Sequence, residues 1–231
     1  MTRIVRGLVL LAAATLHPSP GAAQDPSDPL LNMQAIAQAL GVNCSYCHAR
    51  ETDTSLNFQS EENPKKAVAR QMIAMTRDIN AKVQAATGKA AAQATKVHCL
   101  TCHRGTLIPA RLNDIILRTI RDQGVEAAVA QYRELRQKFF ARDAYDFSEP
   151  DLLNLAQRLA ESSRPDDAIA LMTMNLEFNP TSARSYIVMS RAYTRKRDYD
   201  MAIAQLKKAL EIEPGNGIAK GYLSQLESDR R

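Results

Sequence analysis

The chain has 231 residues, which is enough for one large domain or two modest ones. Aromatic residues make up 5% of the chain and Trp is absent, so the composition favours helices packed on one another or on a cofactor. The net charge of +5 is too small a basic excess to indicate binding of nucleic acid. No segment after residue 23 approaches the length of a transmembrane helix.

Residues 1–23 have the pattern of a signal peptide for export. Arg3 and Arg6 supply the positive start, an apolar run follows over residues 7–16, and small residues at 21–23 offer a cleavage site. The apolar run is too short to span a bilayer as a mature helix. We therefore expect an exported protein, and an uncleaved membrane anchor is the alternative.

Two helices are predicted in residues 24–110. The first begins at Asp28-Pro29, runs to about Leu40 and ends at Gly41. The second begins at Asn63-Pro64 and runs to about Ala86, and the polar residues 49–62 before it are expected to form a loop. Each helix has an apolar stripe at helical spacing, formed by Met33, Ile36, Ala37 and Leu40 in the first and by Val68, Met72, Met75, Ile79 and Val83 in the second.

Each predicted helix is followed by a C-x-x-C-H motif, the attachment signal for c-type haem. The motifs are Cys44-Ser45-Tyr46-Cys47-His48 and Cys99-Leu100-Thr101-Cys102-His103. In such a motif the two thiols bond to the vinyl groups of the porphyrin, and the adjacent histidine ligates the iron. The sequence therefore predicts two covalently bound haem c groups, attached through Cys44, Cys47, Cys99 and Cys102 and ligated by His48 and His103.

Two other uses of these cysteines compete with haem. A zinc site needs four ligands, and each motif supplies only three. Two disulfides would use all four cysteines of the chain but would leave the paired histidines unexplained. Because haem is attached outside the bacterial cytoplasm, the haem interpretation also agrees with export and predicts a periplasmic protein.

Each iron needs a sixth ligand or keeps an open position. The candidates are Met33, Met72, Met75 and His98. Met33 stands eleven residues before Cys44, on a helix that ends just before the motif, so its thioether can fold back onto the haem. The alternative for each methionine is an ordinary place in the apolar core.

The rest of the chain is predicted to be helical. Two helices separated near Gly124 are expected over residues 112–140, and from residue 149 onward there is a 34-residue repeat. The repeat resembles the tetratricopeptide repeat, and its second copy matches better, with Tyr193, Ala202, Ala209 and Pro214. Residues 217–228 would form a terminal capping helix, and the helices of 112–141 would supply further neighbours for the stack.

The predicted fold class is all-α, and four regions are expected. They are a signal peptide (1–23), a dihaem cytochrome domain with little regular structure besides haem-packing helices (24–110), a helical connector (111–148) and a tetratricopeptide-like hairpin stack (149–231). Along the first helix of the second repeat, Arg184, Ile187, Arg191 and Arg195 would form a basic groove for an acidic segment of a partner.

Residues 30–110 resemble one dihaem half of the tetrahaem cytochrome subunit of bacterial photosynthetic reaction centres. The resemblance rests on Met33 with residues 40–48, on residues 69–80, and on residues 99–105. It implies that Met33 is the axial partner of His48 and that Met72 is the partner of His103. Met75 is the alternative for the second haem and His98 a weaker one. The repeat tail is not part of that family, so the resemblance does not imply a photosynthetic role.

Histidine and methionine ligation fits electron transfer, because the thioether favours ferrous iron and raises the reduction potential. The leading interpretation is a periplasmic electron carrier, not an enzyme. Its repeat domain would dock it to a redox partner protein or a membrane electron-transfer complex. The alternatives are a peroxidase-like dihaem enzyme with one open haem site and a haem-bearing sensor or assembly module.

Overall fold

The computed structural model describes residues 29–229. The predicted signal peptide, residues 1–23, and the predicted cap Asp28 lie outside this range. Within it, the secondary structure is almost entirely helical, so the predicted all-α class is confirmed.

The first helix starts later than the sequence predicts. Pro29–Leu31 form a short 3-10 turn (η1), and the α-helix α1 covers Met33–Leu40. Its N-cap is Asn32, whose side-chain oxygen accepts a hydrogen bond from the Ala35 amide at 3.0 Å. The predicted end is confirmed, because Gly41 caps the helix in the left-handed conformation with a φ of 66°.

The segment expected to be a loop, residues 49–62, contains a small hairpin instead. Strand β1 (Ala49–Arg50) pairs antiparallel with β2 (Leu56–Asn57). The Thr52 hydroxyl closes the turn by accepting a hydrogen bond from the Ser55 amide at 3.0 Å. Polar composition alone gave no sign of this pairing, because the strands have only two residues each.

The long helix α2 covers Lys65–Thr87, close to the prediction, and Gly88 ends it with a φ of 62°. Asn80 on α2 holds the chain before the second motif. Its amide nitrogen donates to the Val97 carbonyl at 3.0 Å, and its oxygen accepts from the Val97 amide at 2.7 Å. The short helix α3, Cys99–His103, follows directly and contains the whole second motif.

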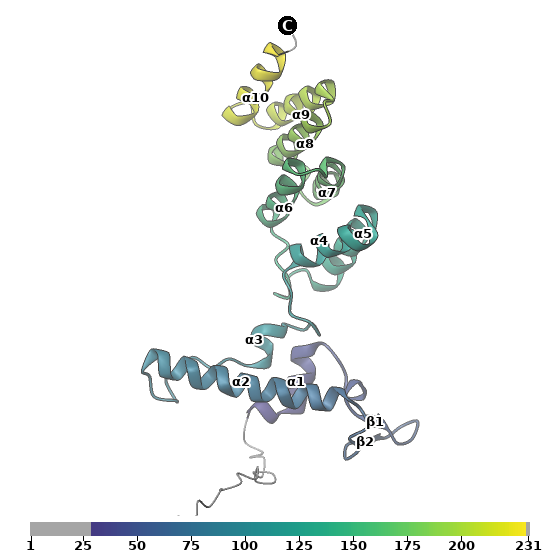
Figure 1. Cartoon of the computed structure of the whole chain (residues 1–231), viewed down its shortest axis with the longest axis vertical. Coiled ribbons are helices and arrows are strands. Elements are labelled where there is room, and N and C mark those ends of the chain that lie inside the picture. Colours follow the sequence, from purple (N-terminus) through teal and green to yellow (C-terminus); the bar gives the residue numbers. More distant parts are fainter. Residues whose placement is uncertain (1–28, 230–231) are drawn as a thin grey trace, which may run out of the picture.

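The remaining helices form hairpins in a single column (Figure 1). Helices α4 (Leu112–Gln123) and α5 (Val125–Phe139) are separated at Gly124, as predicted. The others are α6 (Glu149–Glu161), α7 (Pro165–Phe178), α8 (Ala183–Arg195), α9 (Tyr199–Ile212) and α10 (Gly217–Ser228). The terminal helix α10 has the bounds that the sequence predicts.

Two hydrophobic cores hold this column together. The first joins helices α4 to α8, and its fully buried side chains include Ile116, Tyr132 and Leu171. The second joins α8, α9 and α10 around Leu206. Helices α4 and α5 therefore share a core with the first repeat and act as its neighbours, as expected from the sequence. No helix in residues 29–229 is long and apolar enough to cross a membrane.

The backbones of Gly41 and Gly105 touch where α1 meets the end of α3. The Gly105 amide donates to the Ala39 carbonyl at 2.8 Å. A Cβ at Gly41 would lie 2.2 Å from the Gly105 carbonyl oxygen, which is an impossible contact. Only glycine allows this approach, and the approach brings the ends of the two motif-bearing segments together.

Replacing Gly41 should therefore destabilise the protein far more than replacing a glycine of the same conformation in open space. Gly88 is the matched control, since it also has a positive φ but has no atom within 4 Å of the position that a Cβ would take. Gly88→Ala should cost about 1 kcal/mol for its left-handed backbone, and Gly41→Ala about 3 kcal/mol or more, because backbone overlap is added. Urea unfolding of the purified protein measures both, and equal costs would contradict the contact.

Candidate functional site

The first motif forms a tight turn that gathers its three chemical groups. Residues Cys44–Tyr46 make a 3-10 turn (η2), and the amides of Cys47 and His48 both donate to the Cys44 carbonyl, at 3.3 and 3.0 Å. Cys44 is exposed and Cys47 is half-buried. Burial raises the pKa of the Cys47 thiol, while the nearby Lys65 and Lys66 oppose this rise.

His48 is held from the side of the β-hairpin. Its ring meets Phe58 edge to face, with 4.8 Å between ring centroids. The Nδ1 atom of His48 is buried and has no hydrogen-bond partner among the residues that the structure describes. The histidine that should ligate the first iron is therefore oriented by an aromatic contact.

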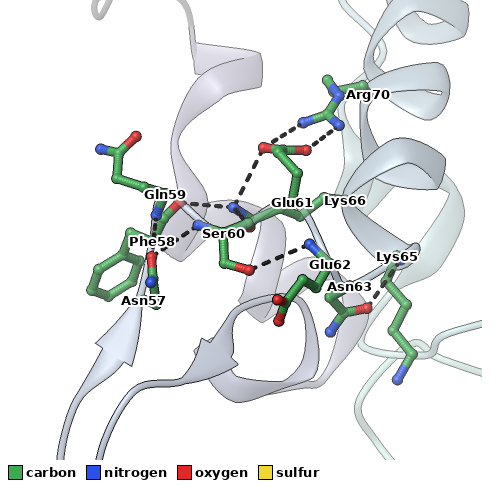
Figure 2. Close-up of polar contacts among 10 residues, drawn as sticks. All are labelled: Asn57, Phe58, Gln59, Ser60, Glu61, Glu62, Asn63, Lys65, Lys66 and Arg70. Carbon is green, nitrogen blue, oxygen red and sulfur yellow. Dashed lines mark hydrogen bonds and ion pairs between the residues drawn. The ribbon is translucent and has the colours of Figure 1, made fainter.

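A buried lysine fixes the segment that carries Phe58 (Figure 2). The Lys66 ammonium donates to the carbonyls of Phe58 at 2.7 Å and of Ser60 at 2.6 Å, and it lies 3.6 Å from the Glu61 carboxylate. Glu61 is paired in turn with Arg70. Because Lys66 is only 8% exposed, these partners replace the water that a charged group needs. Lys66 thus connects α2 to the hairpin that positions His48.

The second motif is organised by a different contact. The Nδ1 atom of His103 lies 2.9 Å from the Thr106 carbonyl oxygen. A carbonyl can only accept, so Nδ1 carries the proton and Nε2 is left with a lone pair for a metal. Burial raises the pKa of the Cys99 thiol at the start of this helix.

One apolar cavity brings together residues from both motifs. Cys47 comes from the first motif, Cys99 and His103 from the second, and Met72 from α2. The remaining wall is mostly apolar and comes from α1, α2 and the segment after α3, through Ile36, Leu40, Val68, Ala69, Ile73 and Leu107. A thioether and an imidazole thus line the same cavity beside a cysteine, which is the donor set that a c-type haem requires.

The other predicted ligands lie elsewhere. Met33 is the first residue of α1 and is 52% exposed, and Met75, 48% exposed, lies one turn beyond Met72 on α2. Neither of these methionines nor His48 lines the cavity shared by Met72 and His103. Cys102 lines a neighbouring cavity next to Tyr145, and His98 lies at the exposed start of α3.

The apolar surface of this region fits a large flat cofactor. In residues 29–110 only Leu30, Ala39 and Ile73 are buried apolar side chains, while eight large ones are exposed: Met33, Phe58, Val68, Met72, Met75, Leu100, Leu107 and Ile108. Such a density of exposed apolar groups marks a binding surface. All four cysteines are free thiols, so they remain available for attachment. The residues present therefore fit haem.

These features fit a c-type haem-binding region followed by a stack of helical repeats. Comparison with known proteins supports both parts. Residues 51–146 match the family model of the photosynthetic reaction centre cytochrome C subunit, and residues 183–216 match the tetratricopeptide repeat. The first motif and Met33 lie before the matched range, and the second motif lies inside it. The fused architecture predicted from the sequence is confirmed.

A known relative is also named as a cytochrome. The chain is 40% identical over 70 residues to cytochrome c-554 of Chloroflexus aurantiacus. The aligned part covers 30% of this chain and 15% of that relative, so the chain spans a small part of its length. The relative's name, like that of the family, is the name of a haem protein.

The structure agrees only in part with the basic groove predicted on the repeats. A cavity is lined by residues of α6, α8 and the terminal helix α10 together with Tyr199 of α9, and its lining includes Arg191 and Arg195. Ile187 does not line it, because this side chain is buried in the second hydrophobic core. Arg191 is engaged by the Tyr222 hydroxyl and lies 3.6 Å from Glu161. The groove is therefore of mixed charge, with Arg195 as an exposed cation.

Sequence reasoning missed the residues that hold the histidines. Lys66 and Phe58 carry no motif, and a lysine in a polar helix is normally expected at the surface. Thr106 stands three residues after His103 and is buried, with 7% exposure. Only its short distance from the motif offered a signal, because the hydrogen bond to the ring depends on the turn after α3.

Removing the Lys66 ammonium should release the hairpin. Lys66→Met leaves the Phe58 and Ser60 carbonyls without their charged donor, and we expect a loss of about 2 kcal/mol in unfolding free energy. Lys65→Met is the control, since Lys65 is exposed and lies over the Tyr46 ring at 3.7 Å, a contact worth about 0.5–1 kcal/mol. Urea unfolding with hydrogen exchange at residues 56–63 measures the difference. Unchanged hydrogen exchange at residues 56–63 in Lys66→Met would show that Lys66 does not hold this segment.

Proposed function

We propose that this protein is a periplasmic dihaem c-type cytochrome that transfers electrons between redox partners. The observation that carries the proposal is the apolar cavity lined by Met72, Cys99 and His103, with a second complete motif beside it. The match to the reaction centre cytochrome family and the relative named cytochrome c-554 support electron transfer. The signal-like residues 1–23 support export.

The chain's own residues hold and tune the cofactor. When bound, haem supplies one-electron oxidation and reduction. The cysteine thiols would bond to the haem, and His48 and His103 would each supply one iron ligand. The Thr106 carbonyl keeps the proton of His103 on Nδ1 and so leaves Nε2 as the atom that would bind iron. Met72 would supply a second ligand from α2, and the apolar lining of the cavity would keep water away from the bound haem.

Filled axial positions favour a carrier over an enzyme. If Met33 and Met72 complete the two ligand sets, no substrate can reach either iron without displacing a thioether. Electron transfer needs no such displacement. The helical stack would then serve to dock the cytochrome to its partner, because stacked tetratricopeptide repeats offer a continuous binding surface.

Haem content and compartment test the proposal directly. Protein purified from the periplasmic fraction should carry two covalent haems, by haem staining and by the pyridine haemochrome spectrum. The double variant Cys44→Ala/Cys47→Ala should carry one haem, and so should Cys99→Ala/Cys102→Ala. A single haem in the unaltered protein, or its retention in the cytoplasm, would refute the dihaem periplasmic assignment.

Axial ligation should depend on Met72 and not on its neighbour Met75. Met72→Ala should remove half of the thioether–iron charge-transfer absorption and open one haem, so that carbon monoxide binds half of the ferrous haem at neutral pH. Met33→Ala should do the same for the other haem, and Met75→Ala should have no effect. If the unaltered protein itself bound carbon monoxide stoichiometrically, a carrier with both irons six-coordinate would be wrong.

Docking of an acidic partner should depend on the exposed cation of the groove. Arg195→Glu reverses one charge in the cavity along α6, α8 and α10, and Lys207→Glu reverses one exposed charge on α9 outside it. In pull-downs from periplasmic extract, we expect Arg195→Glu to reduce recovery of the bound protein about fivefold, the effect of one lost charge-assisted contact, and Lys207→Glu to leave it unchanged. Equal recovery with both variants would exclude this groove.

A further inference from the structure

The two motif histidines differ in what their Nδ1 atoms contact. In His103 this nitrogen donates to the Thr106 carbonyl oxygen at 2.9 Å. The turn that presents this carbonyl is fixed, because the Thr106 hydroxyl and amide both donate to the His103 carbonyl, at 2.6 and 2.8 Å. In His48 the same nitrogen is buried without a hydrogen-bond partner among residues 29–229, and the ring is held by Phe58.

This difference changes what each imidazole gives to a bound iron. A carbonyl that accepts the Nδ1 proton makes the ring a stronger electron donor through its other nitrogen. Stronger donation stabilises ferric iron relative to ferrous iron and so lowers the reduction potential. His103 has this contact and His48 does not. The histidine contacts therefore favour a lower reduction potential at the second motif than at the first.

A buried positive charge beside the first motif acts in the same direction. Lys66 is the only buried charged side chain in the part of the chain that the structure describes. Its ammonium donates to the carbonyl of Phe58, whose ring contacts His48, and its charge opposes the rise in the pKa of Cys47 (Figure 2). Glu61 offsets this charge only in part, because its side chain is 59% exposed to solvent. A weakly screened cation stabilises the added electron of ferrous iron, so Lys66 favours a higher reduction potential at the first motif.

The second motif lies next to the helical stack. Arg104 directly follows His103, and its Nη1 donates to the carbonyl of Asp143, in the segment between α5 and α6, at 3.3 Å. Cys102 of the same motif lines a cavity together with Asp146 from that segment. The first motif instead adjoins the β-hairpin through His48. The two sites therefore have different neighbours as well as different histidine contacts.

We propose that these contacts make the two haem sites unequal, with the lower reduction potential at the second site (Cys99–His103) and the higher at the first (Cys44–His48). The Thr106 carbonyl lowers the one, and the Lys66 ammonium raises the other. For a carrier, this order favours passage of an electron from the site beside the stack to the site beside the hairpin. The inference rests on the proposed function, since it requires haem at both motifs.

Redox titration of two single-haem variants tests the order. Cys44→Ala/Cys47→Ala keeps only the second site and Cys99→Ala/Cys102→Ala only the first, so repulsion between two reduced haems cannot cause a difference. At one applied potential, the ferrous to ferric ratio should be about tenfold or more higher at the first site, as for one hydrogen bond combined with one weakly screened charge. In the unaltered protein, one electron per molecule should give the absorption spectrum of the reduced first site.

Substitutions of Lys66 separate its charge from its structural role. In the full-length haem-loaded protein, Lys66→Met should lower the ferrous to ferric ratio at the first site about tenfold, the order expected for loss of one weakly screened charge. Lys66→Arg keeps the charge and should keep the ratio. Lys82→Met removes an exposed cation from the same helix and should leave the first site unchanged. An equal fall of the ratio in Lys66→Arg would assign the effect to the hairpin and overturn the role of the charge.

Substitutions of Thr106 test the second site in the same protein. Thr106→Val removes the hydroxyl that fixes the turn and should raise the ferrous to ferric ratio at the second site about threefold, within the range for one weakened hydrogen bond. Thr106→Ser keeps the hydroxyl and should restore the ratio.

The outcomes distinguish this inference from the proposed function. Two haems with equal ratios at both sites, a higher ratio at the second site, or equal shifts of both sites in Lys66→Met and Thr106→Val overturn the inference alone. Absence of haem at either motif of the unaltered protein overturns the proposed function and the inference with it.

Discussion

The contact between the backbones of Gly41 and Gly105 is the constraint on which the N-terminal region depends. It places the end of α1, which leads into the first motif, against the residues that follow the second motif. Helix α2 then spans both segments. It contacts the hairpin after the first motif through Lys66 and the chain before the second motif through Asn80. Residues from two motifs that lie far apart in the sequence therefore line one cavity.

The two parts of the protein are stabilised in different ways. Helices α4 to α10 bury a continuous set of leucine, isoleucine and alanine side chains in two cores. Residues 29–110 bury few apolar side chains and expose many, so their helices gain little from packing on one another. Haem is the apolar body that fits this surface, and its covalent attachment would hold it there. In the proposed carrier the cofactor is thus part of the fold as well as of the function.

A polar contact connects these two parts at the junction. Arg104 follows the second motif, and its Nη1 donates to the carbonyl of Asp143, which precedes the first repeat. Ala141 and Asp143 have left-handed backbones in the turn that presents the Asp143 carbonyl to Arg104.

Much of the helical architecture could be predicted because the signals are local. Gly41, Gly88 and Gly124 end helices that apolar spacing had located, and α10 has the predicted bounds. The observed helix bounds differ from the predicted ones where a side chain forms a capping hydrogen bond that the apolar spacing does not reveal. Asn32 supplied an N-cap inside the predicted first helix, which shortened it. In the first repeat the polar side chain of Asn175 is fully buried, and Ser185 and Glu149 accept its amide hydrogens at 2.8 and 3.0 Å.

By itself, the sequence determined the all-α class, the repeats and the chemistry of two C-x-x-C-H motifs, since each depends on residues close together in the chain. Only the tertiary structure decided which methionine shares a cavity with His103 and what holds each histidine. Met72 and Met75 are both on the apolar stripe of α2, and only the positions of α1 and α3 distinguish them. Phe58, Lys66 and Thr106 act through contacts across turns and between helices, and no local pattern encodes such contacts.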